Sequence, residues 1–227
     1  MNLVFLAAAL SGTPKASSER SAPANEALFQ VGRQVISTRD VQISALIADW
    51  NLYRQILQKK SGVVPPQLKL LEKSEPRFEG QAQRLVVETL LVLEAQQFSL
   101  APLEVKKLQS QAREILASLA SQSIQKSQAW TELEILQSLE RSSQSQAFME
   151  FLTQSFTLEV SEFQIQQHYE KNRVRFGAFP LKEFRDTIRE FLLKEAREAR
   201  LTDRIESFRK KHRVRRAAQN HQQRLPS

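Results

Sequence analysis

Apolar residues recur at helical spacing along most of the chain, and this pattern predicts a mainly helical protein. The first periodic run covers residues 41–57 and should end before the Pro-Pro pair that follows it, because proline cannot continue a helix. A second run begins after Pro76. Its residues 85–98 are apolar on nearly every face, which predicts a central, buried helix. A third run follows Pro102 and carries one apolar stripe, as expected of a helix that packs on its neighbours.

Two shorter apolar runs come next, at residues 130–139 and 148–156. The segment between them, 142–146, is rich in Ser and Gln, which favour caps and turns over helix interiors. The pattern therefore predicts two separate helices with a joint at 142–146.

Ser161, with Gln164 three residues later, forms a capping-box sequence that predicts the start of another helix. The apolar spacing extends this helix to residue 176, where a short break containing Gly and Pro follows. The longest periodic run then covers 180–211, and at 1.5 Å per residue it predicts a helix on the order of 45 Å long.

Only two short stretches favour strands. Residues 28–36 alternate around Gly32 and predict a small hairpin, and Val214, between two arginines, predicts a last short strand. The chain has 5 Gly against 8 Pro and few turn dipeptides, which disfavours a sheet-rich fold. We therefore predict an all-α, mainly helical fold with a minor β-hairpin.

The N-terminus resembles an export signal. Residues 3–10 (LVFLAAAL) are all apolar, and small and polar residues follow them, as in the core and cleavage zone of a signal peptide. No Lys or Arg precedes this run, unlike in a typical signal. We predict a signal peptide and flexible lead-in over 1–24 and an exported, periplasmic protein. The alternative is a disordered tail with a chance apolar patch, on a cytoplasmic protein.

The net charge of +8 is concentrated near the C-terminus. Residues 171–227 carry 17 Lys and Arg against 7 Asp and Glu, whereas residues 1–170 carry 16 against 18. The basic residues could meet an anionic membrane surface or, with less support, nucleic acid phosphates. They could equally form a solvated face and complement the dipole of the helix that they end. The candidate anion-binding residues are Arg209, Lys210, Lys211, Arg213, Arg215 and Arg216.

Catalytic patterns are absent from the sequence. Its histidines, His168, His212 and His221, have no metal-binding spacing, and the chain contains no cysteine and no phosphate-binding or nucleophile-elbow motif. We therefore predict that the protein is not an enzyme, takes no cofactor or metal and has no small-molecule substrate.

Aromatic and other large apolar side chains gather in one part of the chain. Phe and Met suit contacts with varied polypeptides because they repack easily, so this cluster is a candidate peptide-binding surface. The alternative is that its members form the core beneath the long closing helix. The candidate residues are Trp130, Phe148, Met149, Phe151, Leu152 and Phe156.

Four segments together resemble SurA-type periplasmic chaperones. VGRQVISTRDV (31–41) is similar to that family's hairpin and capped first helix, and residues 86–115 to its central helix pair. VSEFQIQQHYEKNRVRF (160–176) is similar to the helix after its substrate-binding module, and residues 184–215 to its closing helix. The resemblance covers about residues 28–216.

This resemblance implies a helical chaperone domain over 25–216, followed by a basic disordered tail at 217–227. The closing helix, 180–211, should pack on the N-terminal module, and the last strand should join the N-terminal hairpin. Family members often carry a parvulin-type prolyl isomerase domain of about 90–100 residues before the closing helix. Only residues 177–180 stand at that place here, so isomerase activity is not expected.

The implied function is that of an ATP-independent holdase, whose clients are unfolded outer-membrane or secreted polypeptides. The main alternative is a basic helical structural or regulatory protein that binds an anionic partner through its C-terminal tail. A weaker third possibility is a partner subunit for an isomerase encoded elsewhere.

Overall fold

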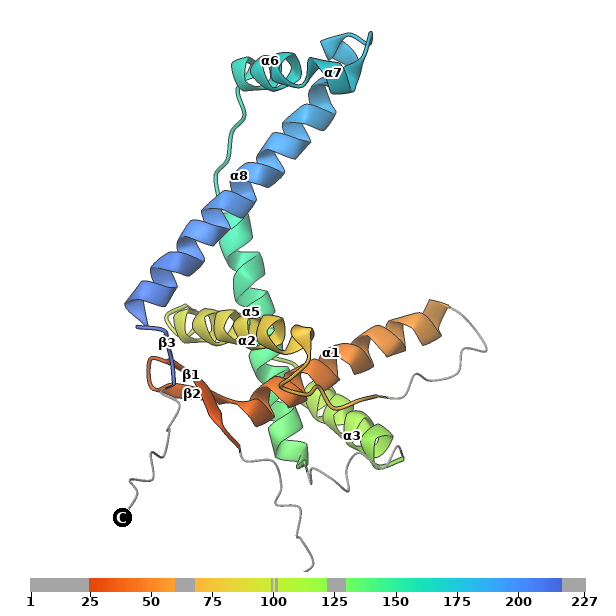
Figure 1. Ribbon diagram of the computed structural model, residues 1–227, viewed down its shortest axis with the longest axis vertical. Helices are drawn as coiled ribbons and strands as arrows, with labels where there is room; N and C mark the ends of the chain where they lie inside the picture. The colour runs from red at the N-terminus through yellow and green to blue at the C-terminus, as the bar shows by residue number, and fades with distance from the viewer. Residues whose placement is uncertain (1–24, 60–67, 99, 101, 122–129, 218–227) are drawn as a thin grey trace, which may run out of the picture.

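The computed structural model describes residues 25–59, 68–98, 100, 102–121 and 130–217 (Figure 1). The predicted signal segment 1–24, the predicted end of the first helix near residue 61 and the tail from residue 218 lie outside these described residues.

The described chain is mainly helical and carries one small sheet, which confirms the predicted fold class. The strands are β1 (Ala27–Val31), β2 (Gln34–Ser37) and β3 (Arg215–Arg216). The helices are α1 (Thr38–Lys59), α2 (Pro76–Ala95), α3 (Val105–Ser121), α5 (Glu132–Ser155), α6 (Glu162–Lys171), α7 (Arg173–Phe176) and α8 (Leu181–Lys211).

The sheet joins the two ends of the described chain. β1 pairs antiparallel with β2 through the predicted hairpin, and β3 pairs antiparallel with the other edge of β1, with Phe29 opposite both Ile36 and Arg216. Gly32 occupies the hairpin turn at φ +60°, a conformation that glycine adopts without steric cost. The N- and C-terminal segments are therefore strand partners, as expected for the closing strand.

The molecule has a helical body and a projecting arm (Figure 1). The body comprises the sheet, α1, α2, α3, α5 and the C-terminal end of α8. The arm comprises residues 160–192, that is α6, α7 and the first turns of α8. Figure 1 shows α8 running from β3 away from the body to α6 and α7 at its far end.

Three apolar clusters hold these parts together. In the first, α2 contacts the sheet, the C-terminal half of α5 and Phe208 of α8. The second joins α1, α3 and the N-terminal half of α5, and contains both tryptophans, Trp50 and Trp130. The third lies in the arm, where Ile165 and Tyr169 of α6 meet Ile188 of α8. α2 is buried along most of its length, as its apolar pattern predicts.

Local capping signals mark the helix starts that the sequence indicated. Ser161 Oγ accepts a hydrogen bond from the Gln164 amide, and the Gln164 side chain accepts one from the Ser161 amide, so the predicted capping box is present. At α1, the Ser37 amide donates to Asp40 Oδ2 at 2.9 Å, and the Asp40 amide donates back to Ser37 Oγ at 3.3 Å. Both arrangements satisfy amides that would otherwise lack partners at a helix N-terminus.

The predicted joint at 142–146 is wrong, because α5 is one continuous helix. Ser145 is buried, and its hydroxyl donates to the Ser142 carbonyl at 2.8 Å, so this serine is satisfied without leaving the helix. Ile135 packs in the second cluster and Leu152 in the first, so tertiary packing on both sides of the segment outweighs its weak helix propensity.

The helix predicted to run from Ser161 to residue 176 is interrupted. α6 ends at Lys171, and Asn172 leaves helical geometry with φ −109° and ψ 20°. Its side-chain amide donates to the His168 carbonyl at 2.8 Å, which caps the end of α6 before α7 begins.

Candidate functional site

A group of phenylalanines lies where α2, α5 and α8 meet. Phe148 is completely buried, and its ring centroid lies 5.3 Å from that of Phe98, 6.0 Å from Phe151 and 6.4 Å from Phe208. The Phe98 and Phe151 rings are 5.2 Å apart and are 44% and 40% exposed. Phe98, Phe148 and Phe151 are called the aromatic patch below.

The helix geometry of α5 explains this arrangement. Phe148 and Phe151 are three residues apart and so lie on the same side of the helix. Phe208 of α8 belongs to the same apolar cluster as Phe148, and the rings of these two residues are in contact. Phe98 and Phe151 therefore lie on a packed base and still present apolar surface to solvent.

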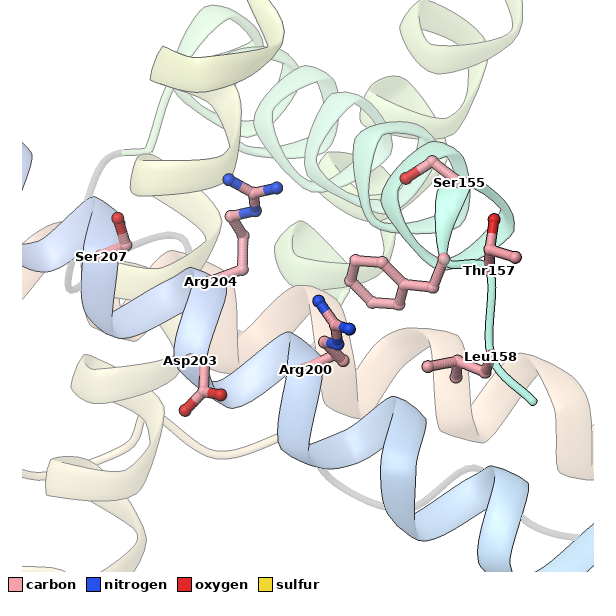
Figure 2. A pocket seen from close by; sticks show the side chains of 8 residues that line it. Ser155, Thr157, Leu158, Arg200, Asp203, Arg204 and Ser207 are labelled. Carbon is pink, nitrogen blue, oxygen red and sulfur yellow. The ribbon is translucent and has the colours of Figure 1, made fainter. Parts of the chain in front are cut away.

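A cleft of about 540 Å³ opens between the end of α5 and the side of α8. Figure 2 shows Ser155, Thr157 and Leu158 on one wall, and Arg200 and Arg204 on α8 on the other. The lining residues, called the cleft below, are Ser155, Phe156, Thr157, Leu158, Arg200, Asp203, Arg204 and Ser207.

The cleft adjoins the aromatic patch. Ser155 follows Phe151 by four residues on α5, so the two side chains lie on one face of the last turns. Phe156 packs against the first apolar cluster and also lines the cleft. An extended segment lying along the end of α5 could therefore touch phenyl rings first and guanidinium groups next.

An ionic latch fixes the end of α8 beside this site. The Glu94 carboxylate of α2 is almost fully buried, and it lies 2.7 Å from Lys211 Nζ and 2.5 Å from His212 Nε2. Burial by itself would raise the pKa of Glu94, but the hydrogen bonds and charges of Lys211 and His212 outweigh burial and lower the pKa. The His212 carbonyl accepts the Gly32 amide at 2.8 Å, which ties the latch to the hairpin.

The predicted peptide-binding residues divide between core and surface. Phe148 and Leu152 are buried in the first cluster and Trp130 in the second, so each contributes to packing. Phe151 is exposed in the aromatic patch, Met149 and Phe156 are partly buried, and a peptide-binding role for them stays a prediction.

Met149 lies apart from the aromatic patch. It lines a groove of about 610 Å³ between α2 and α5, together with Val87 and Leu91. Two residues spaced as Met149 and Phe151 lie on different sides of a helix, so these two side chains do not form one surface.

Three functional candidates had not been singled out from the sequence, namely Phe98, Arg200 and Arg204. Phe98 is the last apolar member of the run that predicts a buried helix, but it lies beyond the end of α2 at Ala95 and turns toward α5. The arginines stand in a helix with many charges, where no local signal separates them from solvated neighbours.

Four of the six predicted anion-binding residues contact the protein itself. Lys211 pairs with Glu94, and Arg216 pairs with Glu79 and lies over the Phe29 ring. The other two contact glutamine oxygens: Arg209 Nη2 donates to Gln83 Oε1 at 3.2 Å, and Arg215 Nε donates to Gln30 Oε1 at 3.0 Å. Lys210 and Arg213 are exposed, and neither forms an ion pair within the described residues.

Among the described residues, no group of three or more His, Cys, Asp or Glu side chains is placed to hold a metal ion. No helix described in the structure has the length and apolar character needed to cross a membrane. Comparisons of the chain with protein-family models, curated proteins and solved structures found no match. The aromatic patch and the cleft carry exposed apolar and charged groups that suit binding.

Proposed function

We propose that the protein is an ATP-independent chaperone that holds unfolded polypeptides and has no isomerase activity. The aromatic patch is the observation that carries this proposal. Phe98 and Phe151 keep about two-fifths of their surface in water although they lie on a packed base. Exposed apolar surface of this kind favours contact with apolar segments of another chain.

The size of the patch predicts weak, reversible binding. If each phenylalanine offers on the order of 200 Å² in total, the two rings expose about 160–170 Å². At about 25 cal/mol per Å², covering them would contribute about 4 kcal/mol before the cost of ordering the client. That free energy alone corresponds to a dissociation constant of about 1 mM, so useful affinity needs further contacts.

The cleft and the arm offer such contacts. Phe156 and Leu158 extend the apolar surface from the patch into the cleft. On the arm, Phe163 is 72% exposed and Val174 is 96% exposed. A long unfolded client could touch several of these places at once, and linked weak contacts raise the overall affinity.

The proposed compartment and clients rest on the resemblance to SurA-type chaperones. We propose that the protein acts in the periplasm on outer-membrane or secreted polypeptides before they fold. The pairing of β3 with β1 and the packing of α8 on α2 support this proposal, because they match the architecture that the resemblance implies.

Light scattering tests the proposal directly. A urea-unfolded outer-membrane β-barrel protein is diluted into buffer with a few-fold excess of the protein. We expect wild type to slow aggregation, and Phe98→Ser/Phe151→Ser to lose most of that effect. Leu52→Ser/Leu133→Ser is the matched control, because it removes two side chains that are 58% and 61% exposed elsewhere on the body.

The proposal fails if wild type does not slow aggregation. If the control variant loses as much protection as the patch variant, the patch is not the client site. Circular dichroism of each variant shows whether the fold is retained, so that loss of protection is not confused with unfolding.

Binding of an anionic partner through the basic C-terminal residues is the alternative proposal, and it has less support. Arg209, Lys211, Arg215 and Arg216 have contacts within the protein, so part of the predicted basic surface is used to dock α8. Affinity for anionic vesicles that falls steeply with salt, and is lost in Lys210→Gln/Arg213→Gln, would favour this alternative, because these two residues are exposed and form no ion pair in the described residues.

A further inference from the structure

The middle of α8 carries a row of arginines on one face. Arg197, Arg200 and Arg204 are separated by three and four residues, which places their side chains along one side of the helix. All three are exposed, and none forms an ion pair within the described part of the chain. Like charges at this spacing repel one another.

The other arginines of α8 form ion pairs with acidic side chains. Arg185 and Arg189 both contact Glu162 of α6, at 2.7 and 2.6 Å. Lys194 lies 3.9 Å from Glu198, and Arg209 lies 3.5 Å from Glu206. The arginines of α8 that form no ion pair in the described residues therefore lie between residues 197 and 204, and two of them, Arg200 and Arg204, line the cleft.

The cleft places two of these arginines opposite an apolar wall. Arg200 and Arg204 line the cleft from α8, and Leu158 and the end of α5 form the facing wall; Asp203 also lines the cleft, but Figure 2 shows its carboxylate on the other side of α8 from the Arg204 guanidinium. Asp203 forms no ion pair with either arginine in the described residues. An incoming carboxylate would meet two positive charges and, beside them, apolar side chains.

We infer that the cleft selects client segments in which an acidic side chain is flanked by aromatic or aliphatic residues. This inference rests on the proposed chaperone function and adds a chemical preference to it. The apolar flanks would lie on Phe156, Leu158 and the aromatic patch, while the carboxylate is held between Arg200 and Arg204. Guanidinium groups suit this role because they bind carboxylates through paired N–H donors.

The preference should be modest and sensitive to salt. The guanidinium groups are exposed, and exposed ion pairs contribute little each, so we expect an acidic peptide to bind about fivefold tighter than its neutral counterpart at low salt. The difference should shrink as salt shortens the range of the attraction, to roughly 3 Å at 1 M.

The test uses three fluorescein-labelled peptides with the same alternating Leu and Phe residues and with Glu, Gln or Lys at the central positions. Fluorescence anisotropy with the full chain gives their dissociation constants. We expect affinity to fall in the order Glu, Gln, Lys. Arg200→Gln/Arg204→Gln should remove the difference between the peptides and leave the affinity for the Gln peptide unchanged.

A matched control separates local recognition from net charge. Arg175→Gln/Lys182→Gln also removes two positive charges, and both residues are exposed on the arm without an ion pair in the described residues. The control should keep the preference for the Glu peptide. If it loses that preference as fully as the cleft variant does, the effect is one of overall charge and the inference is overturned.

The remaining outcomes distinguish this inference from the proposed function. If the Glu and Lys peptides bind equally while wild type still slows client aggregation, the acidic preference is refuted and the chaperone proposal stands. If no peptide binds and aggregation is not slowed, both are refuted.

Discussion

Replacing Glu94 with Gln should release the end of the closing helix. The Glu94 carboxylate is 6% exposed and accepts hydrogen bonds from Lys211 and His212, and hydrogen bonds to charged groups contribute about 1.5–3 kcal/mol each. Glutamine keeps the shape and one acceptor but loses the charge. The Lys211 side chain is 49% exposed and can turn to water, so we expect a net loss of about 2 kcal/mol in docking this end of α8.

Amide hydrogen exchange measures that loss at the latch itself. The Gly32 amide donates to the His212 carbonyl, and the Ala217 amide donates to the Leu28 carbonyl at 2.9 Å, so both exchange when the end of α8 opens. A loss of about 2 kcal/mol should speed their exchange by about 30-fold. Tryptophan fluorescence should change little, because Trp50 and Trp130 both lie in the second apolar cluster.

A control variant makes the measurement specific. Glu206 is 58% exposed and pairs with Arg209 at 3.5 Å, so Glu206→Gln removes an acidic partner of a basic residue at the same end of α8. We expect a change within about 0.5 kcal/mol, as for most exposed pairs. Equal exchange rates in wild type and Glu94→Gln would refute the reasoning, because the buried carboxylate would then contribute nothing to docking.

Three further changes test other parts of the fold. Arg213 has φ 49°, a left-handed backbone conformation that is strained for a residue with a side chain. Arg213→Gly should relieve this strain and raise the free energy of unfolding, measured by urea titration, by about 0.5–1 kcal/mol. A lower urea midpoint would contradict this. Ile188→Asp puts an unpaired charge in the apolar cluster of the arm and should reduce the helical circular dichroism. The fluorescence of the tryptophans in the body should not change. A melting curve like that of wild type would show that the apolar stripe of α8 is not packed. The hydrogen bond from Arg39 lowers the pKa of Glu134 from 4.5 to about 2, so the contribution of this pair should be complete above pH 4.5 and be lost as pH falls toward 2. The pair is 26% and 31% exposed, so we expect a loss of about 1–2 kcal/mol, and Arg39→Met should flatten this pH dependence.

Elements with strong local signals could be predicted from the sequence. The capping box at Ser161, the glycine turn at Gly32 and the proline at the start of α2 each act within a few residues. The apolar stripe of α8 is long enough to define one helix from its periodicity alone. The start or end of each of these elements is determined by residues that are close to it in the sequence.

Two features that the sequence pattern did not predict, the continuity of α5 and the cleft, depend on tertiary packing. The segment around Ser145 has a composition typical of a joint, but the helix continues because Phe148 and Leu152 on one side and Leu139 on the other are buried against different clusters. The cleft depends on where α8 passes the end of α5. Arg200 and Arg204 are far from Phe156 in sequence, so no local pattern could place them in one site.

The two ends of α8 are held by different interactions, and this arrangement leaves its middle available for binding. Phe208 and the Glu94 latch fix the C-terminal end to the body, and Ile188 fixes the N-terminal end within the arm. Because the helix is held at both ends, the fold does not require the charged side chains in its middle part to form ion pairs. Because Arg200 and Arg204 lie in this middle part, a substitution there should change client binding and leave the anchors intact. The same reasoning distinguishes Phe151 from Phe148. Phe151 is exposed, so its replacement should leave the fold intact, whereas Phe148 is completely buried, so its loss should destabilise the packing beneath the aromatic patch.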